Sequence, residues 1–288
     1  MNVLKKRRSY NRSYGGDAFI FLVLGVFSVL MLLPMIYAFS NALKPLDELF
    51  IYPPRFFARN PNLQNFKTLF LLFDNARVPL SRYLFNTVFV TVVGTAGQVI
   101  VSSMCAYAIA KLRFPGREVI FRIIVVSLMF NSVVTGITNF LVIRALGLLD
   151  TYWAVIVPTF SSSLGLYLMK QFMEQMVPDT VLEAAKIDGA GAGYTFFRIV
   201  MPMVRPAWLT LIIFAFQSLW NTGASPYVFS EQYKTVNYAL SQVLAGGVAR
   251  TGAAAAGTVL TMLVPIVMFL FTQSNVVETM ATSGMKDG

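Results

Sequence analysis

The glycine-rich run from Asp188 to Gly193 is the part of this sequence whose residue types and spacing come nearest to a chemical site. Glycines alternating behind an acidic residue could suggest a loop that holds nucleotide phosphates. The run matches neither the G-x-G-x-x-G pattern that follows a strand nor the P-loop, which ends in Gly-Lys-Ser/Thr. We therefore expect any nucleotide to be bound by another polypeptide.

Groups that could catalyse a reaction are also missing from the apolar parts of the chain. There is no histidine, which excludes His-ligated metals and His-based triads. No charged residue lies inside any long apolar run, and such residues are the usual mark of proton relays and ion coupling. The single cysteine, Cys105, lies in an apolar run and offers no disulfide framework. The sequence predicts no enzyme and no metal site.

Composition places the chain in a membrane. Of its 288 residues, 56% are apolar and 12% charged, and the mean hydropathy of +0.65 is that of an integral membrane protein. The net charge is +10, but the basic residues are scattered between apolar runs. They fit the charges that set membrane topology better than a nucleic-acid surface.

Six charge-free runs are long enough to cross a hydrocarbon core of about 30 Å. The predicted fold is all-α, with a six-span domain over 18–277 between tails 1–17 and 278–288. An even number of spans puts both termini on one side, and the basic residues Lys5, Lys6, Lys111 and Arg113 place that side in the cytoplasm. The spans are expected at about 18–39, 83–110, 123–143, 151–169, 206–228 and 253–273.

The polar stretch from Glu183 to Pro202, EAAKIDGAGAGYTFFRIVMP, interrupts the apolar pattern between the fourth and fifth spans. Thr180 could cap a helix, with Glu183 reaching back to complete a capping box. Gly189 is the natural left-handed residue to end that helix, and Pro202 is expected to stop a second one. The stretch predicts two short helices at an angle, outside the bilayer on the cytoplasmic side.

This stretch closely resembles the EAA loop of ATP-binding-cassette (ABC) importer permeases. The family pattern runs EAA, two residues, DGA, an aromatic residue, Ile, a hydrophobic residue and Pro. The matching positions are Glu183, Ala184, Ala185, Asp188, Gly189, Ala190, Phe197, Ile199, Pro202 and Pro206, and Met201 stands where Leu is usual. Further segments resemble carbohydrate permeases of the maltose-type second subunit: Asn86–Thr87, Ala106–Ala108, Phe114–Arg117, Leu146–Tyr152 and Trp220–Asn221.

The resemblance covers most of the chain from about Ser81. It implies the type I importer permease fold, with a cytoplasmic coupling helix in the loop 178–202, in a bacterial cytoplasmic membrane. It also implies a second permease subunit as heterodimer partner, two ABC ATPase subunits that bind ATP and Mg, an extracytoplasmic solute-binding protein and a carbohydrate substrate. The residues that it places at the ATPase are Glu183, Ala184, Ala185, Asp188, Gly189, Ala190, Gly284 and Lys286.

A path for a neutral polyol needs amide or hydroxyl groups for hydrogen bonds and aromatic faces for the C–H surfaces of the sugar. The candidates are Asn131, Asn139, Gln217, Trp220 and Asn221. These residues could line a solute path or have a purely structural role, and both alternatives stay open. Polar groups often only bridge membrane helices, and Trp is enriched at membrane interfaces. For the run 161–163, Ser-Ser-Ser, we favour close packing over a cavity.

Two other functions remain open. One is an ABC permease for a non-sugar solute. The other is a secondary carrier, for which we would expect an intramembrane carboxylate or an inverted repeat. The sequence shows neither feature.

Overall fold

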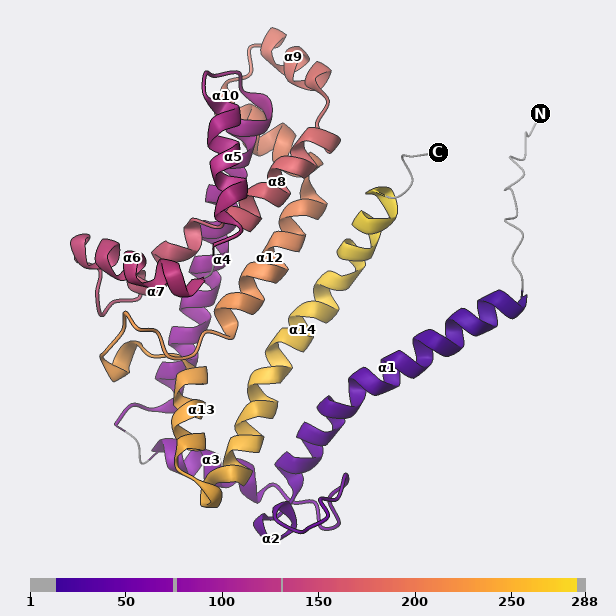
Figure 1. The fold of residues 1–288 in the computed structure, drawn as a ribbon, viewed down its shortest axis with the longest axis vertical. Coiled ribbons are helices and arrows are strands. Elements are labelled where there is room, and N and C mark those ends of the chain that lie inside the picture. The colour runs from indigo at the N-terminus through magenta and orange to yellow at the C-terminus, as the bar shows by residue number, and fades with distance from the viewer. Residues whose placement is uncertain (1–13, 75–76, 131, 284–288) are drawn as a thin grey trace. The chain divides into compact units, whose positions relative to one another are not determined.

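The computed structural model of this chain describes residues 14–74, 77–130 and 132–283, and these residues form helices joined by turns and loops (Figure 1). No strand occurs in the described residues. The α-helices are α1 Tyr14–Leu43, α2 Leu46–Leu49, α3 Gln64–Asp74, α4 Leu80–Lys111, α5 Arg117–Ser127, α6 Ser132–Ala145, α7 Trp153–Phe160, α8 Ser163–Met176, α9 Asp179–Ile187, α10 Ala192–Tyr194, α11 Met201–Met203, α12 Arg205–Trp220, α13 Val236–Ala245 and α14 Thr251–Ser283. A π-helix, η1, spans Thr195–Val200, and two 3-10 turns, η2 and η3, span Glu231–Tyr233 and Val248–Arg250.

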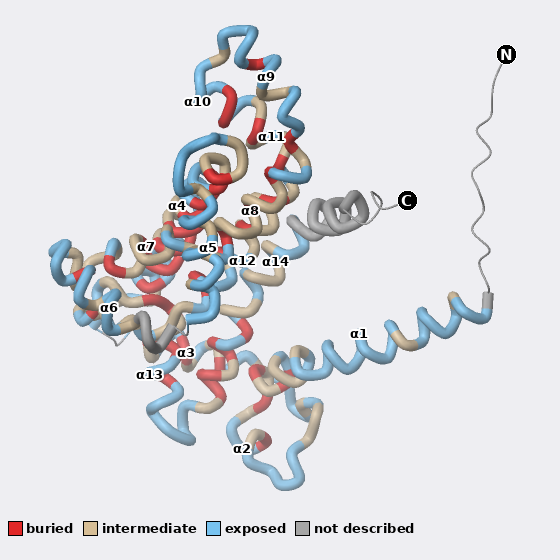
Figure 2. The backbone as a smooth tube through the Cα atoms, turned by 45° about the horizontal axis from the view of Figure 1, so that its top comes forward, coloured by how far each residue is buried: buried red, intermediate tan, exposed pale blue. Residues whose placement is uncertain are grey.

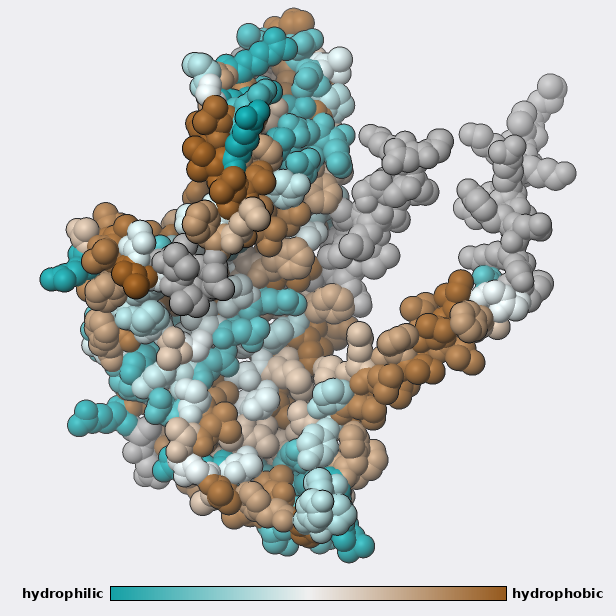
Figure 3. All heavy atoms as spheres, viewed as in Figure 1, coloured by the Kyte–Doolittle hydropathy of each residue, from teal (hydrophilic) through white to brown (hydrophobic). Residues whose placement is uncertain are grey.

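One compact unit comprises Met1–Leu69 and Gly247–Val259. Its α1 exposes apolar side chains along its length, as a helix surrounded by lipid would (Figures 2 and 3). The connection that follows α1 is folded around two buried charged residues. Lys44 Nζ donates to Asn41 Oδ1 at 2.7 Å, while the Glu48 carboxylate accepts the backbone N–H groups of Arg59 and Asn60.

The other unit comprises Phe70–Gly246 and Leu260–Gly288, and α4 is its central helix, packed against α7, α8 and α12. Two glycines let these neighbours approach closely. A Cβ atom on Gly97 would lie 2.1 Å from Phe160 Cε1, and one on Gly94 would lie 2.7 Å from Leu219 Cδ1. The α4 helix is therefore packed so closely against its neighbours that an added Cβ at either position would require Phe160 or Leu219 to move.

Three helices in the described residues are long and apolar enough to cross a membrane: Gly15–Leu43, Leu80–Lys111 and Val248–Phe271. A fourth crossing is possible if Ala192–Met203 and Arg205–Trp220, which meet at 82°, count as one span. The count of six spans stays a prediction.

Three expected spans differ from the helices observed. The run 123–143 is divided between α5 and α6, and the run 151–169 between α7 and α8, where Ser162 Oγ accepts the Gly165 N–H and caps a new helix. The run 206–228 is helical only to Trp220. A run without charges predicts hydrophobicity, but it does not predict that the helix is continuous.

We expect Gly97→Ala to destabilise the chain, because the new methyl group would overlap the Phe160 ring. Overpacking of this kind costs about 1–3 kcal/mol. The apparent melting temperature of the purified chain measures the effect. Gly136→Ala on α6 is the matched control, since its Cβ would meet nothing within 4 Å. Equal melting temperatures for the two variants would contradict the close packing of α4.

Candidate functional site

The first arm of the polar hairpin is α9, which begins directly after Pro178. Asp179 occupies the first turn, where a carboxylate interacts favourably with the helix dipole. The predicted capping box of Thr180 and Glu183 is wrong, because Pro178 holds the N-cap position without a side-chain hydrogen bond and Thr180 lies inside the helix.

The end of α9 is a Schellman motif built on Gly189, whose φ is +76°. The Gly189 N–H donates to Lys186 O at 3.1 Å, and the Ala190 N–H donates to Ala185 O at 2.9 Å. The predicted left-handed glycine is confirmed. Only glycine adopts this φ without strain, so the residue fixes the direction in which the chain leaves the helix.

The second arm runs through α10, η1 and α11 to a sharp bend at Val204. The prediction that Pro202 stops this helix is wrong, because helical backbone continues to Met203. Pro202 has no N–H to donate to the preceding turn, and that turn is the wider π-helix η1. The Trp208 indole N–H donates to Met201 O at 3.0 Å and joins the two sides of the bend.

Buried apolar side chains pack the base of this hairpin against the neighbouring helices. Val200 and Val204 have no exposed surface, and Phe196 is 5% exposed. They belong to one core cluster with side chains of α4, α8 and α12: Val99, Ala106, Met169, Met173, Val177, Ala207 and Leu211. The bend and the helix ends therefore form one packed body, and a displacement of the hairpin has to be shared by the helices that it touches.

An ion pair ties α9 to α4 on the surface of this body. Lys111 Nζ lies 2.7 Å from Asp179 Oδ1, and only 7% of the lysine side chain is exposed. The hydrogen bond and charge of Lys111 hold the pKa of Asp179 below its ordinary value. The pair is therefore formed throughout the neutral range.

The tip of the hairpin is open to solvent. Of the residues predicted to contact the ATPase, the structure exposes Glu183, Ala184, Asp188 and Gly189, half-buries Ala190 and buries Ala185. Three apolar side chains beside them are exposed to 86%, 62% and 58%: Ile187, Tyr194 and Phe197. The space-filling view shows hydrophilic residues at the end of the unit that carries α9 (Figure 3). Gly284 and Lys286 lie outside the described residues.

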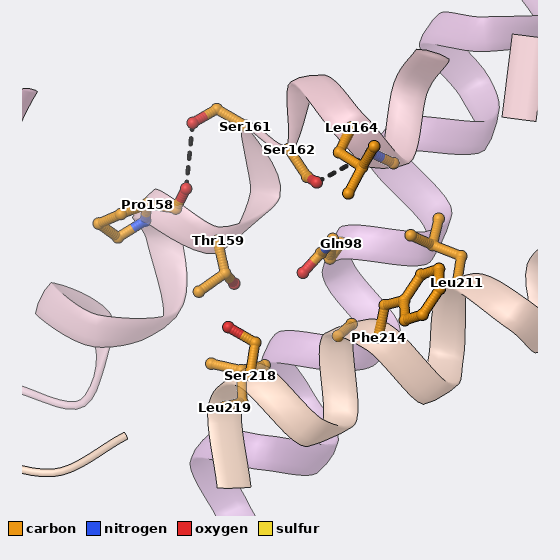
Figure 4. A pocket seen from close by; sticks show the side chains of 12 residues that line it. Gln98, Pro158, Thr159, Ser161, Ser162, Leu164, Leu211, Phe214, Ser218 and Leu219 are labelled. Atoms are coloured by element: carbon orange, nitrogen blue, oxygen red, sulfur yellow. Dashed lines mark hydrogen bonds between the residues drawn. The ribbon is translucent and has the colours of Figure 1, made fainter. Parts of the chain in front are cut away.

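A hollow of about 280 Å³ opens between the middle of α4, the break between α7 and α8, and α12 (Figure 4). Gln98 lies between the break and α12, and Thr159 and Ser218 lie near it from either side. All the polar residues that line the hollow are uncharged: Gln98, Thr159, Ser161, Ser162 and Ser218. Irregular backbone at membrane depth is tolerated where it lines such a space, so the break between α7 and α8 fits this position.

The face of α4 that carries Gln98 is polar over several turns. Thr87, Thr91, Thr95, Gln98 and Ser102 are buried at intervals of three or four residues, which places them along one side of the helix. Thr87 is fully satisfied, because its hydroxyl donates to Tyr83 O and accepts the Val236 N–H, both at 2.9 Å. The hydroxyls of Thr91, Thr95 and Ser102 are buried without a hydrogen-bond partner.

The path residues predicted from the sequence do not line this hollow. Asn139, Gln217 and Asn221 are exposed. Trp220 is 4% exposed, and its indole N–H donates to Thr261 O at 3.0 Å. Asn131 lies outside the described residues.

Sequence reasoning missed three lining residues, Gln98, Thr159 and Ser218. The repeat of polar residues at every third or fourth position along α4 is the sequence pattern from which Gln98 could have been predicted. The serine run turns out to be divided in its roles: Ser161 and Ser162 line the hollow, while Ser163 hydrogen-bonds Ser127 at 2.7 Å.

At the other end of α4, the loop that precedes α13 is held by Asp150, which has a φ of +58°. Its carboxylate accepts the N–H groups of Phe229 and Ser230 at 2.9 and 2.7 Å and the Ser230 hydroxyl. Asn86 holds the same loop, since its amide donates to Gln232 O and Lys234 O at 2.8 Å. The loop is therefore fixed to α4 and to the turn before α7.

Comparison with known proteins identifies the family to which this chain is similar. Residues 98–276 match the family model described as binding-protein-dependent transport system inner membrane component. The chain is 33% identical over 210 residues to the polygalacturonan/rhamnogalacturonan transport system permease protein YtcP of Bacillus subtilis, covering 72% of this chain and 69% of that one. It is 30% identical to the sn-glycerol-3-phosphate transport system permease protein UgpE of Yersinia enterocolitica, covering 90% and 94%.

Other matches agree in kind. The trehalose transport system permease protein SugB of Mycobacterium tuberculosis is 27% identical and covers 88% of this chain. Among solved structures, a chain of a bacterial ABC transporter involved in the import of the acidic polysaccharide alginate aligns with a TM-score of 0.77. That alignment covers 92% of this chain and 99% of the other at 22% identity, and it shows the fold.

We expect Asp150→Ala to release the loop before α13. Hydrogen bonds from Ser230 lower the pKa of the carboxyl, so the carboxylate stays ionised and its bonds hold through the ordinary titration range of aspartate, around pH 3.9. This contribution to stability is complete at neutral pH and is lost only as the pH falls through the lowered pKa. Amide hydrogen exchange at Phe229 and Ser230 measures the release, and Asp47→Ala, at an exposed position of α2, is the control. Unchanged exchange in Asp150→Ala would refute the role of this carboxylate.

Proposed function

This chain belongs to the family of inner membrane components of binding-protein-dependent transport systems, and we propose that it is one of two permease subunits of an importer that moves a carbohydrate into the bacterial cytoplasm. It is a non-catalytic subunit of an ABC importer, in which ATP hydrolysis belongs to a separate subunit. Family membership favours an importer over the secondary carrier. In this proposal ATP and Mg bind to two ABC ATPase subunits, and both termini of this chain are cytoplasmic.

The hollow beside Gln98 is the observation that carries the carbohydrate assignment. Its polar lining consists of amide and hydroxyl groups without a charge, which suits a solute that offers many hydroxyl groups. Several relatives are named for sugar or polysaccharide transport. The relative named for sn-glycerol-3-phosphate supports the second candidate, a non-sugar solute. A charged solute would find no countercharge among the residues that line this hollow.

We place the solute path along the polar face of α4. A buried hydroxyl without a partner costs about 1–3 kcal/mol, and Thr91, Thr95 and Ser102 each carry this cost in the arrangement described. A permease alternates between arrangements, so groups that lack partners in one can meet water or solute in another. On this reading the three hydroxyls extend the lining of the hollow when α4 separates from its neighbours.

The hairpin 178–202 is proposed as the contact with an ATPase subunit. Its exposed side chains Ile187, Tyr194 and Phe197 offer an apolar surface beside the acidic Glu183 and Asp188. The core cluster at its base gives a mechanical reason for the assignment, since it joins the hairpin to α4, α8 and α12. Movement of the ATPase pair would then reach the helices that border the hollow.

The loop between α12 and α13 is proposed as a contact for the solute-binding protein. It lies at the N-terminal end of α4, where Asn86 and Asp150 hold it in place. The hairpin contacts the opposite end of α4, at Lys111. Phe229 of the loop is 60% exposed. Because the loop is already ordered, a partner that binds to it can act on α4 directly.

Gly189→Pro is expected to abolish the coupling of transport to ATP hydrolysis while the chain still inserts into the membrane. Proline cannot adopt a φ of +76°, and it cannot donate to Lys186 O. The measurement is ATPase activity stimulated by the solute-loaded binding protein in the reconstituted complex. Gly193→Ala is the matched control, because a Cβ at Gly193 would meet nothing within 4 Å and its φ is not positive. Unchanged stimulated activity in Gly189→Pro would sink the coupling assignment.

Thr91→Val and Thr95→Val are expected to raise the melting temperature and to slow transport. Valine removes a hydroxyl without a partner at nearly constant volume, which stabilises the described arrangement by roughly 1 kcal/mol or more over one in which the hydroxyl is satisfied. Uptake of labelled sugar in proteoliposomes and thermal melting of the same samples measure both effects. Thr87→Val is the control of opposite sign, because it loses two hydrogen bonds and should lower the melting temperature. A fall in melting temperature for all three variants would count against the path along α4.

A further inference from the structure

A second polar hollow, of about 290 Å³, lies between the start of α5 and α8. Arg117, Glu118, Phe121 and Arg122 line it from α5, and Lys170 and Glu174 line it from α8. A neighbouring hollow is lined by Arg113, Phe114, Pro115 and Arg117, so that Arg117 belongs to both. The hollow between α5 and α8 shares no lining residue with the hollow beside Gln98.

The charge of this region is unbalanced toward the positive. Lys170 is used internally, because its Nζ lies 2.7 Å from Glu174 Oε2 and 4.1 Å from the centre of the Phe121 ring. The guanidinium groups of Arg113, Arg117 and Arg122 have no ion-pair partner among the described residues. Arginine presents a planar fork of donors that fits the oxygens of a phosphate. Arg117 and Arg122, the two arginines that line the hollow itself, can therefore accept an anionic phosphate group, and with Lys170 they outnumber the carboxylates of Glu118 and Glu174 there.

The hollow lies where a basic surface changes to an apolar one. Val119, Ile120 and Ile123 on α5 are exposed to 60%, 45% and 64%, and they follow Arg117 within two turns. On the face shown in Figure 3, hydrophilic and hydrophobic residues lie side by side over α5 and α10. A molecule with an anionic head and an apolar tail meets complementary chemistry on both parts of this surface.

We propose that the hollow between α5 and α8 binds the phosphate headgroup of an anionic phospholipid, with the acyl chains along the exposed apolar side of α5. The side of the membrane rests on the proposed function, which puts this end of α4 and α5 in the cytoplasmic leaflet. Basic pockets between membrane helices on that side bind anionic headgroups.

The bound lipid would act on packing that leads to the hairpin. Phe121 stacks on Tyr167 with ring centres 6.0 Å apart, and Ser127 hydrogen-bonds Ser163 at 2.7 Å, so α5 and α8 contact along the same face. Met173 of α8 belongs to the core cluster at the base of the hairpin. A headgroup held between α5 and α8 therefore stabilises the helix on which the hairpin is mounted.

The test compares the intact transporter, with its partner subunits, in nanodiscs of phosphatidylcholine alone and of phosphatidylcholine mixed with phosphatidylglycerol. We expect phosphatidylglycerol to raise the melting temperature of the wild type, and short-chain phosphatidylglycerol to bind to the double variant Arg117→Gln/Arg122→Gln at least roughly tenfold more weakly. Arg144→Gln, which removes an exposed arginine near the end of α6, is the matched control and should bind like the wild type.

Three results would overturn the proposal. Equal weakening in Arg144→Gln would show a general effect of charge. Equal stabilisation by inorganic phosphate in phosphatidylcholine discs would show a site for the free ion. Loss of the ATPase subunits from the double variant in phosphatidylcholine discs would show that the arginines contact that partner. ATPase activity of the double variant in phosphatidylcholine discs, stimulated by the solute-loaded binding protein, is expected to continue, so failure of this inference leaves the proposed function intact.

Discussion

The packing around Val200 and Val204 is the constraint on which the rest of the proposed mechanism depends. Both residues are fully buried, at the point where the second arm of the hairpin turns by 82° into α12. A core packed at this density does not absorb displacement gradually. The hairpin, the end of α8 and the start of α12 must therefore move together or repack together, and a force applied outside the membrane reaches the hollow.

The polar groups that line the hollow are all uncharged. A charge at membrane depth is expensive, whereas an amide or hydroxyl costs less and can exchange one partner for another. Gln98 and the hydroxyls of Thr91 and Thr95 are groups of this kind. Their weak individual attraction suits a subunit that must release what it holds. The burial of the Thr91 and Thr95 hydroxyls without partners raises the energy of the arrangement described.

The sequence was sufficient for the helical class, the polar hairpin and the turn at Gly189, because glycine chemistry and a dense motif are local. The errors came from competition between neighbouring residues. Thr180 is a good capping residue, but Pro178 two positions earlier already begins the helix. Pro202 usually ends a helix, but a π-helical turn before it accommodates the missing donor. Such outcomes depend on three-dimensional packing that no single residue type encodes.

The hollow shows why site residues were harder to predict than the fold. Asn and Trp stand out in an apolar run, yet Trp220 is used to hold α14 through Thr261. The residues that meet around the hollow come from three separate parts of the chain, and each is ordinary by itself. What brings them together is small size: Gly165 lets Leu211 and Ser102 approach, since a Cβ there would lie 2.9 and 3.1 Å from their side chains. The site is thus positioned by a glycine whose role is visible only once the helices are packed.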